Sequence, residues 1–223
     1  MNLIEAKNIH KTYSNGKNSL MVLKGIDVSL EKGKFIAIVG PSGAGKSTLL
    51  HILGGLDSPT QGKVLLEGQD LYSLSDEKIS RVRNERIGFV FQFYHLLPEF
   101  TVFENVLMPA WLGNNTGLSI KDRAAELLVE IGLGERMKHF PGELSGGEKQ
   151  RVAIVRGLIN NPRVLFCDEP TGNLDSKTGE EVIETIRKIN LENKMTVVLV
   201  THNIELAKSA DKVYHLRDGL LVN

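Results

Sequence analysis

The residues best suited to chemistry lie in one glycine-rich segment. Positions 40–47 match the pattern G-x-x-x-x-G-K-[ST], whose glycines let the backbone turn tightly and point successive N–H groups at phosphate oxygens. Lys46 can bridge the β- and γ-phosphates of a nucleotide, and the Ser47 hydroxyl can ligate Mg²⁺. A chance glycine-rich turn is the alternative, which the apolar strand before the loop and the helix after it disfavour. The predicted ATP-binding residues here are Gly40, Pro41, Ser42, Gly43, Ala44, Gly45, Lys46, Ser47 and Thr48.

Two carboxylates follow another apolar segment. Residues 164–167 are typical of a buried strand, and Asp168 and Glu169 come directly after it. Ligands of an open α/β sheet bind at the carboxyl ends of its strands, so both acids can face the phosphates. We expect Asp168 to hold Mg²⁺ and Glu169 to take a proton from the attacking water. Without a phosphate loop in the chain, the pair would equally suit the polar start of a loop.

A histidine ends a further apolar strand. His202 follows residues 197–201, and its strand end is expected beside that of Asp168. There it can hydrogen-bond the γ-phosphate and the attacking water, although a lone histidine is more often structural. The predicted catalytic residues are therefore Glu169, His202 and Lys46.

A second glycine-rich segment opens a helix later in the chain; it consists of Leu144, Ser145, Gly146, Gly147 and Glu148. Ser145 is a good N-cap, and the amides of the two glycines form an anion site at the helix N-terminus. One nucleotide does not need two phosphate cradles from one chain. We therefore expect this cradle to serve the γ-phosphate bound to a second copy; an ordinary capped helix is the alternative.

The elements that position these residues can be read from apolar periodicity. Up to residue 35 the chain alternates apolar and polar residues, as antiparallel strands with one wet face do. Strands are then predicted over residues 35–39, 64–66, 87–91, 164–167 and 196–200, and helices over 49–53, 76–86, 101–112, 120–131, 146–159 and 177–192. A short helix and a small hairpin close the chain. Alternating strands and helices predict an α/β fold with a parallel core, into which a helical block is inserted.

Composition narrows the function classes. The chain has 223 residues, 41% of them hydrophobic, which suits one compact domain. Lys+Arg and Asp+Glu both count 27, so the basic surplus of a nucleic-acid binder is missing and no nucleic-acid partner is expected. Cys167 is the one cysteine, which excludes an intramolecular disulfide. No signal peptide or membrane-spanning segment is predicted, so we expect a soluble chain that another protein recruits to any membrane.

Together and in this order, the phosphate loop (Walker A), the Leu144–Glu148 signature, the Asp168–Glu169 strand end (Walker B) and the switch histidine resemble the ATPase subunits of ABC transporters. The resemblance covers essentially the whole chain. It implies a P-loop NTPase fold with a RecA-like, mostly parallel core, an antiparallel β subdomain and an α-helical subdomain at about residues 95–160, all within one ATPase domain, residues 1–223. It also implies Mg²⁺-dependent ATP hydrolysis by a homodimer that sandwiches two ATP molecules, with the signature acting in trans.

The same resemblance assigns lesser motifs. Tyr13 matches the aromatic residue that stacks on adenine, and Gln92 matches the glutamine that touches Mg²⁺, so that the metal ligands become Ser47, Gln92 and Asp168. The D-loop, which crosses to the other subunit, corresponds to Asn173, Leu174 and Asp175. Two departures are visible: Glu148 stands where many members have Gln, and Asn203 follows the switch histidine where Asp is frequent.

Residues 91–101, followed by Glu104-Asn105-Val106, lie where the family contacts its membrane subunits. They resemble the LolD group, whose members power lipoprotein release from the bacterial inner membrane; MacB-type efflux ATPases and FtsE-type cell-division ATPases are the close alternatives. The resemblance implies integral membrane partners (LolC/LolE-like) and a peripheral location on the cytoplasmic face of the inner membrane. A chromosome-type ABC ATPase head is the rival from another class, and the lack of long heptad-rich segments counts against it.

Overall fold

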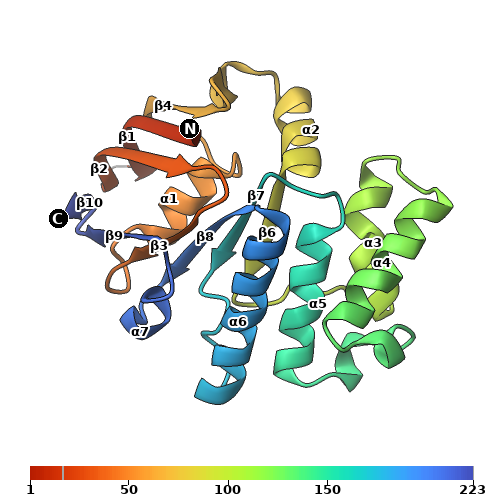
Figure 1. Cartoon of the computed structure of the whole chain (residues 1–223). Coiled ribbons are helices and arrows are strands. Elements are labelled where there is room, and N and C mark those ends of the chain that lie inside the picture. The colour runs from red at the N-terminus through yellow and green to blue at the C-terminus, as the bar shows by residue number, and fades with distance from the viewer. Residues whose placement is uncertain (17, 223) are drawn as a thin grey trace. The chain divides into compact units, whose positions relative to one another are not determined.

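The computed structural model describes residues 1–16 and 18–222, and these form two compact units. The first unit comprises Met1–Ser80 and Asn190–Asn223, and the second comprises Arg81–Ile189. Figure 1 labels most of the elements of both units. The helical block predicted at residues 95–160 lies within the second unit, which also contains two strands.

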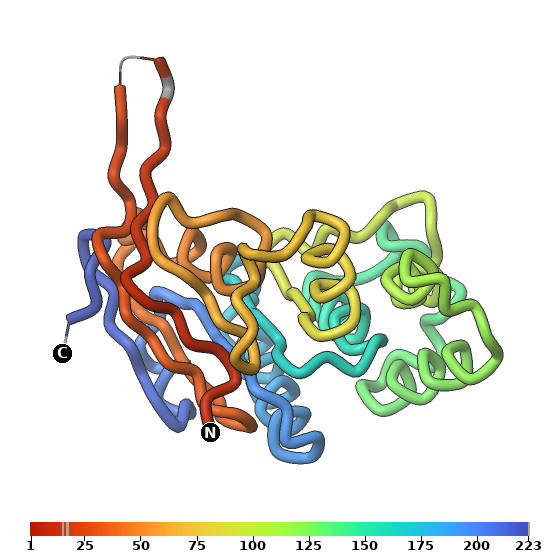
Figure 2. Tube along the Cα trace, turned by 90° about the horizontal axis from the view of Figure 1, so that it is seen from above, coloured from red at the N-terminus to blue at the C-terminus, as the bar shows by residue number. Residues whose placement is uncertain are grey.

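The first unit contains an antiparallel sheet with the strand order β2-β1-β4-β5. Its strands are β1 (Asn2–Asn15), β2 (Asn18–Glu31), β4 (Gln61–Leu66) and β5 (Gln69–Asp70). β1 and β2 form a long hairpin that projects from the rest of its unit (Figure 2). Ile26, Val28 and Leu30 are buried while their neighbours are more exposed, which confirms the predicted strand with one wet face.

The first unit also carries a mostly parallel sheet, whose order within this unit is β10-β9-β3-β8. Its strands are β3 (Phe35–Val39), β8 (Thr196–Thr201), β9 (Lys212–Arg217) and β10 (Leu220–Val222), accompanied by helices α1 (Lys46–Leu53) and α7 (Ile204–Ala207). Every residue of β3 and β8 is buried, because helices or strands cover both faces of a parallel sheet. β3 therefore leads the chain from the core straight into the glycine-rich loop.

The second unit pairs two parallel strands, β6 (Ile87–Phe91) and β7 (Val164–Asp168), with a set of helices. The helices are α3 (Val102–Leu112), α4 (Leu118–Glu130) and α5 (Gly146–Leu158), while α2 (Asp76–Arg86) and α6 (Ser176–Asn193) each begin or end in the first unit. Short 3₁₀ turns at Gly134–Arg136 and Pro141–Glu143 join α4 to α5. These elements match the predicted ones to within a few residues.

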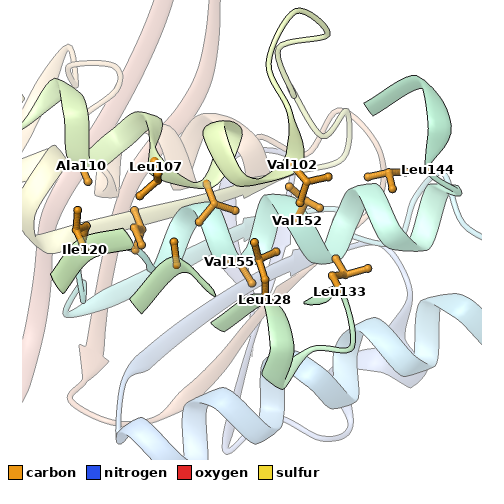
Figure 3. Close-up of a cluster of buried hydrophobic side chains, with 12 residues drawn as sticks. Val102, Leu107, Ala110, Ile120, Leu128, Leu133, Leu144, Val152 and Val155 are labelled. Atoms are coloured by element: carbon orange, nitrogen blue, oxygen red, sulfur yellow. The ribbon is translucent and has the colours of Figure 1, made fainter. Parts of the chain in front are cut away.

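A separate apolar core holds α3, α4 and α5 together (Figure 3). Its buried members are Val102, Val106, Leu107, Ala110, Ile120, Ala124, Leu128, Leu133, Leu144, Val152, Val155 and Ile159. Leu144, the first residue of the second glycine-rich segment, is only 6% exposed in this core. Burial of such side chains is worth roughly 1.5–3 kcal/mol each, so the start of α5 is firmly anchored.

Two glycines let α5 lie directly against β6. A Cβ atom on Gly88 would lie 2.3 Å from the carbonyl oxygen of Gly157, and one on Gly157 would lie 3.2 Å from the carbonyl oxygen of Phe89. A side chain at Gly88 would clash with the backbone of α5, and one at Gly157 would be tightly packed. Among residues 1–16 and 18–222, no helix combines the length and apolar character needed to cross a bilayer.

Candidate functional site

The glycine-rich loop between β3 and α1 has the conformation that the sequence predicts. Gly43 and Gly45 have φ angles of 80° and 100°, in the left-handed region that favours glycine, and Gly45 is the N-cap of α1. Lys46 is 6% exposed, and its ammonium Nζ donates to the carbonyl oxygen of Pro41 at 3.1 Å. The lysine thus folds back over the loop that a phosphate group would enter, at the positive end of α1.

Residues of β2 and β9 pack tightly against the glycine-rich loop. A Cβ atom on Gly40 would lie 2.0 Å from the carbonyl oxygen of Leu216 in β9, and one on Gly45 would lie 2.9 Å from Cδ2 of Leu23 in β2. No side chain fits at Gly40 without moving backbone atoms. Packing therefore requires glycine at the first position of the motif, and at the sixth position packing and a positive φ angle both favour it.

Tyr13, at the end of β1, is fixed by neighbours from the same unit. Its hydroxyl donates to Oδ2 of Asp57 at 2.7 Å, and the ammonium of Lys11 lies 4.8 Å from its ring centroid. Lys11 in turn donates to Oδ1 of Asp57 at 2.6 Å and to the carbonyl oxygen of Ser58 at 2.7 Å. Tyr13 is therefore tied to the segment that follows α1, and 45% of the residue is exposed.

His202 follows β8 at the same sheet edge as the phosphate loop. β3 and β8 are parallel with Val39 opposite Thr201, so Gly40 and His202 leave neighbouring strand ends. Asn203, the departure noted above, has a structural use: its side chain accepts from the backbone N–H of Glu205 at 2.9 Å and caps α7. Asp168 belongs to the second unit, and the expectation that His202 lies beside it stays a prediction.

In the second unit, the carboxylates and the glutamine leave neighbouring strand ends. β6 and β7 are parallel with Phe91 opposite Asp168, so Gln92 and Glu169 directly follow the paired residues. Glu169 has a φ angle of 47°, in the left-handed region that non-glycine residues rarely adopt. Such strain is concentrated at functional sites, where it holds a side chain in one direction.

Gln92 is held by the loop that follows β7. Its Nε2 donates to Oδ1 of Asn173 at 3.2 Å, and Nδ2 of Asn173 donates to the backbone oxygen of Gln92 at 3.0 Å. A Cβ atom on Gly172 would lie 2.6 Å from Nε2 of Gln92, so a larger residue there would displace the Gln92 amide. The predicted metal-contacting glutamine and the predicted D-loop are thus joined within one chain.

The second glycine-rich segment forms a capped helix N-terminus. Ser145 accepts from the backbone N–H of Glu148, and the Glu148 carboxylate accepts from the backbone N–H of Ser145 at 2.8 Å, which completes a capping box. These hydrogen bonds, together with Arg136 at 3.3 Å, hold the pKa of Glu148 below its usual range despite partial burial. Glu148 therefore caps the helix as an ionised residue.

The glycines of this segment are packed against the D-loop and its helix. A Cβ atom on Gly146 would lie 3.1 Å from both Cδ2 of Leu174 and the hydroxyl of Tyr94, and one on Gly147 would lie 2.5 Å from Cγ2 of Thr178. Asp175 accepts from the backbone N–H of Thr178 at 3.0 Å, which lowers the pKa of its carboxyl group. The signature and D-loop residues thus form one packed surface.

Arg156, on α5, holds the segment that follows Gln92. Its guanidinium donates to the backbone oxygens of Tyr94 at 2.6 Å and His95 at 2.5 Å, and His95 has a φ angle of 50°. Burial lowers the pKa of the guanidinium. Arg156 had no assigned role in the sequence, because a lone arginine in a helical pattern carries no signal of such a contact.

The residue types predicted as metal ligands are ones that suit magnesium. Among the residues that the structure describes, no group of three or more His, Cys, Asp and Glu residues can hold a metal ion. Mg²⁺ prefers a few oxygen ligands and keeps water and phosphate oxygens for the rest. A serine hydroxyl, an amide oxygen and a carboxylate, as in Ser47, Gln92 and Asp168, are ligands of this kind.

Comparison with known proteins gives consistent results. The model of the ABC transporter family matches residues 23–172. The lipoprotein-releasing system ATP-binding protein LolD of Acinetobacter baylyi is 48% identical over 222 residues, which cover 99% of this chain and 97% of that protein. The LolD protein of Geobacter metallireducens is 50% identical over 223 residues, covering 99% and 98%.

Solved structures with the same fold include two dimers. One is a post-hydrolysis state of the ATP-binding cassette MJ0796 bound to ADP and Pi, with a TM-score of 0.90 and 40% sequence identity over 99% of this chain and 97% of that one. The other is a dimer of the same bacterial ABC transporter cassette, with a TM-score of 0.90, 41% identity and the same coverage. The predicted P-loop NTPase fold is thereby confirmed.

Proposed function

The chain belongs to the ABC transporter family of ATPases, and from this premise we propose that it powers lipoprotein release from a bacterial inner membrane. The observation that carries the proposal is the match to LolD proteins over nearly the full length of both chains. It favours lipoprotein release over the efflux and cell-division branches. Its membrane partners are then LolC/LolE-like subunits, and the chain works at the cytoplasmic face of that membrane.

Binding of ATP begins at the phosphate loop. The N–H groups between Gly40 and Thr48 receive the phosphate oxygens, and the positive end of α1 adds to their attraction. Lys46, which donates to the loop carbonyl of Pro41, turns to the β- and γ-phosphates when nucleotide arrives. Tyr13 stacks on adenine, and its partly exposed ring supports that role.

Ser47, Gln92 and Asp168 are proposed to hold Mg²⁺, which neutralises negative charge on the phosphates. Gln92 is suited to such a role because Asn173 and Gly172 fix its side chain. Glu169 takes the proton of the attacking water, and the left-handed backbone at this residue supports a fixed direction for its carboxylate. His202 positions the γ-phosphate and the water.

The signature segment serves a second copy of the chain. Ser145 and the amides of Gly146 and Gly147 lie at the N-terminus of helix α5. A helix N-terminus is a favourable place for an anion to bind. ATP therefore favours the paired form, because the nucleotide contacts both copies only there. Hydrolysis removes the γ-phosphate and reopens the pair, and the membrane subunits convert the cycle into work on a lipoprotein.

The chemical part is tested with Glu169→Gln. This variant is expected to bind ATP, to hydrolyse it at least about 100-fold more slowly, and to accumulate as a dimer in size-exclusion chromatography with ATP and Mg²⁺. Glu180→Gln, on the exposed surface of α6, is the matched control and should behave as the unmodified chain. Unchanged turnover by Glu169→Gln would exclude this residue as the base.

The biological part is tested by the partner. The chain should co-purify with a membrane protein, and lipoproteins should stay in the inner membrane of cells that carry only the Glu169→Gln variant. Turnover stimulated by DNA, with no membrane partner, would instead favour the chromosome-type ATPases.

A further inference from the structure

The Tyr13 ring, which is proposed to stack on the base, is held by two other side chains that also contact each other. Lys11, Tyr13 and Asp57 each contact the other two: the two oxygens of Asp57 bind one partner each, and the Lys11 ammonium lies over the Tyr13 ring. We call these residues the tyrosine clamp. One contact on the hydroxyl and one on the ring restrict both side-chain torsions of Tyr13.

The clamp is charged, and its charges are balanced. Burial would raise the pKa of the Asp57 carboxyl, but hydrogen bonds from Lys11 and Tyr13 outweigh burial and lower it. The carboxylate is therefore ionised at neutral pH and accepts a hydrogen bond from the tyrosine hydroxyl.

The position of Asp57 in the chain connects the clamp to the phosphate loop. Asp57 lies four residues beyond the end of α1, and the backbone N–H groups of Leu56 and Asp57 donate to the carbonyl oxygen of His51 at 2.8 and 3.3 Å. The Tyr72 hydroxyl lies 2.5 Å from the carbonyl oxygens of both Ile52 and Asp57, and its one proton can be donated to either. The end of helix α1 is therefore tied to Tyr13 through Asp57.

We propose that Asp57 is a positioning residue for nucleotide binding: with Lys11 it holds the Tyr13 ring in the orientation that stacks on the base, at a fixed place relative to α1 and its phosphate loop. This inference rests on the proposed function, and it adds a residue outside the motifs discussed above. With the ammonium on one face of the ring, the base stacks on the opposite face. Stacking tolerates any purine, so the clamp sets affinity and not the choice between adenine and guanine.

The expected effect follows from pre-organisation. A tyrosine freed from the clamp must be ordered again when nucleotide binds. The free-energy cost of ordering one side chain corresponds to roughly three- to tenfold weaker binding. Asp57→Ala should therefore weaken ATP and GTP binding by that factor. Tripolyphosphate, which has no base, should bind the variant and the unmodified chain equally. Asp27→Asn is the matched control, because the Asp27 carboxylate accepts from the backbone of Asn8 and not from the clamp.

A double-mutant cycle separates positioning from a general structural effect. Tyr13→Ala removes the ring, and in that background Asp57→Ala should cost no further ATP affinity. An equal loss with and without the ring would overturn the proposal, as would unchanged ATP affinity in Asp57→Ala itself. Tripolyphosphate binding also reports whether the phosphate loop is folded; if Asp57→Ala loses it, Tyr13→Phe, which removes only the hydroxyl, carries the test with the same expected loss of ATP affinity.

The two proposals fail in different ways. If the unmodified chain bound tripolyphosphate and ATP equally well, no base stacking would exist and the role of Asp57 would be overturned while phosphate binding survived. If the unmodified chain bound neither, the proposed ATPase function would be overturned, and the role of Asp57 with it.

Discussion

Gln92 and Asn173, 81 positions apart in the chain, hold each other through two hydrogen bonds, one to a side-chain oxygen and one to a backbone oxygen. One of the two residues follows β6 and the other lies in the loop after β7. The contact joins the segment after Gln92 directly to the D-loop, with no intermediate element. It also gives Gln92 one fixed direction before any ligand is present.

Asn173→Ala should weaken the response to Mg²⁺. Without Asn173 the Gln92 side chain loses its acceptor, so the Mg²⁺ concentration for half-maximal ATPase should rise roughly three- to tenfold, the cost of ordering one side chain. The measurement is a Mg²⁺ titration of ATPase activity at saturating ATP. In a Gln92→Ala background the same substitution should add nothing, and an unchanged Mg²⁺ dependence in the single variant would contradict the assignment.

Gly147→Ala should destabilise the chain by roughly 1–3 kcal/mol, because the added methyl would lie 2.5 Å from Cγ2 of Thr178. The double variant Gly147→Ala with Thr178→Ser removes that methyl and should regain stability in urea unfolding. If Gly147 also faces the nucleotide of a second copy, ATPase activity stays low in the double variant. Full recovery of activity would restrict Gly147 to a packing role.

Arg156→Ala should lower the free energy of unfolding by roughly 1–3 kcal/mol, because the backbone oxygens of Tyr94 and His95 lose a charged donor. Arg156→Lys can serve one of the two oxygens and should recover part of this loss. The measurement is urea unfolding, analysed with one common m-value, the slope of the unfolding free energy against urea concentration. Equal midpoints for the alanine variant and the unmodified chain would show that water replaces the guanidinium.

Cys167 should make the fold sensitive to alkali. Burial raises the pKa of its thiol, and the charge of Asp168 adds to the effect. An unfolded chain loses this proton near pH 8.5, whereas the folded chain keeps it, so stability falls as the pH rises above that value, by up to about 1.4 kcal/mol per pH unit. Cys167→Ala should show a shallower decline between pH 9 and 10.5 in urea unfolding. Parallel curves for both proteins would contradict the buried, protonated thiol.

The sequence predicts local features of this protein well. The phosphate loop, the Ser145 cap and the strands β3, β7 and β8 depend on neighbouring residues, so that their patterns are visible without a structure. Boundaries differ by a residue or more where a cap intervenes; Thr101 was expected in a helix and instead caps α3, which begins at Val102.

The contacts between distant segments could not be read in the same way. Asp57 meets Tyr13 across 44 positions, and Arg156 meets Tyr94 across 62. Neither pair has a spacing or a composition that distinguishes it from ordinary surface residues. The positive φ angle of Glu169 was equally invisible, because strain at one residue depends on the surrounding fold and leaves no trace in the residue type.

The burial of Cys167 has a practical consequence. It is 0% exposed and is the one cysteine of the chain, so a thiol-reactive probe would not modify the native protein. A cysteine placed at the exposed Leu118 would then take a nitroxide spin label alone, with no need to remove the native thiol first. Electron–electron dipolar spectroscopy on that protein would report the distance between two copies directly, before and after ATP is added.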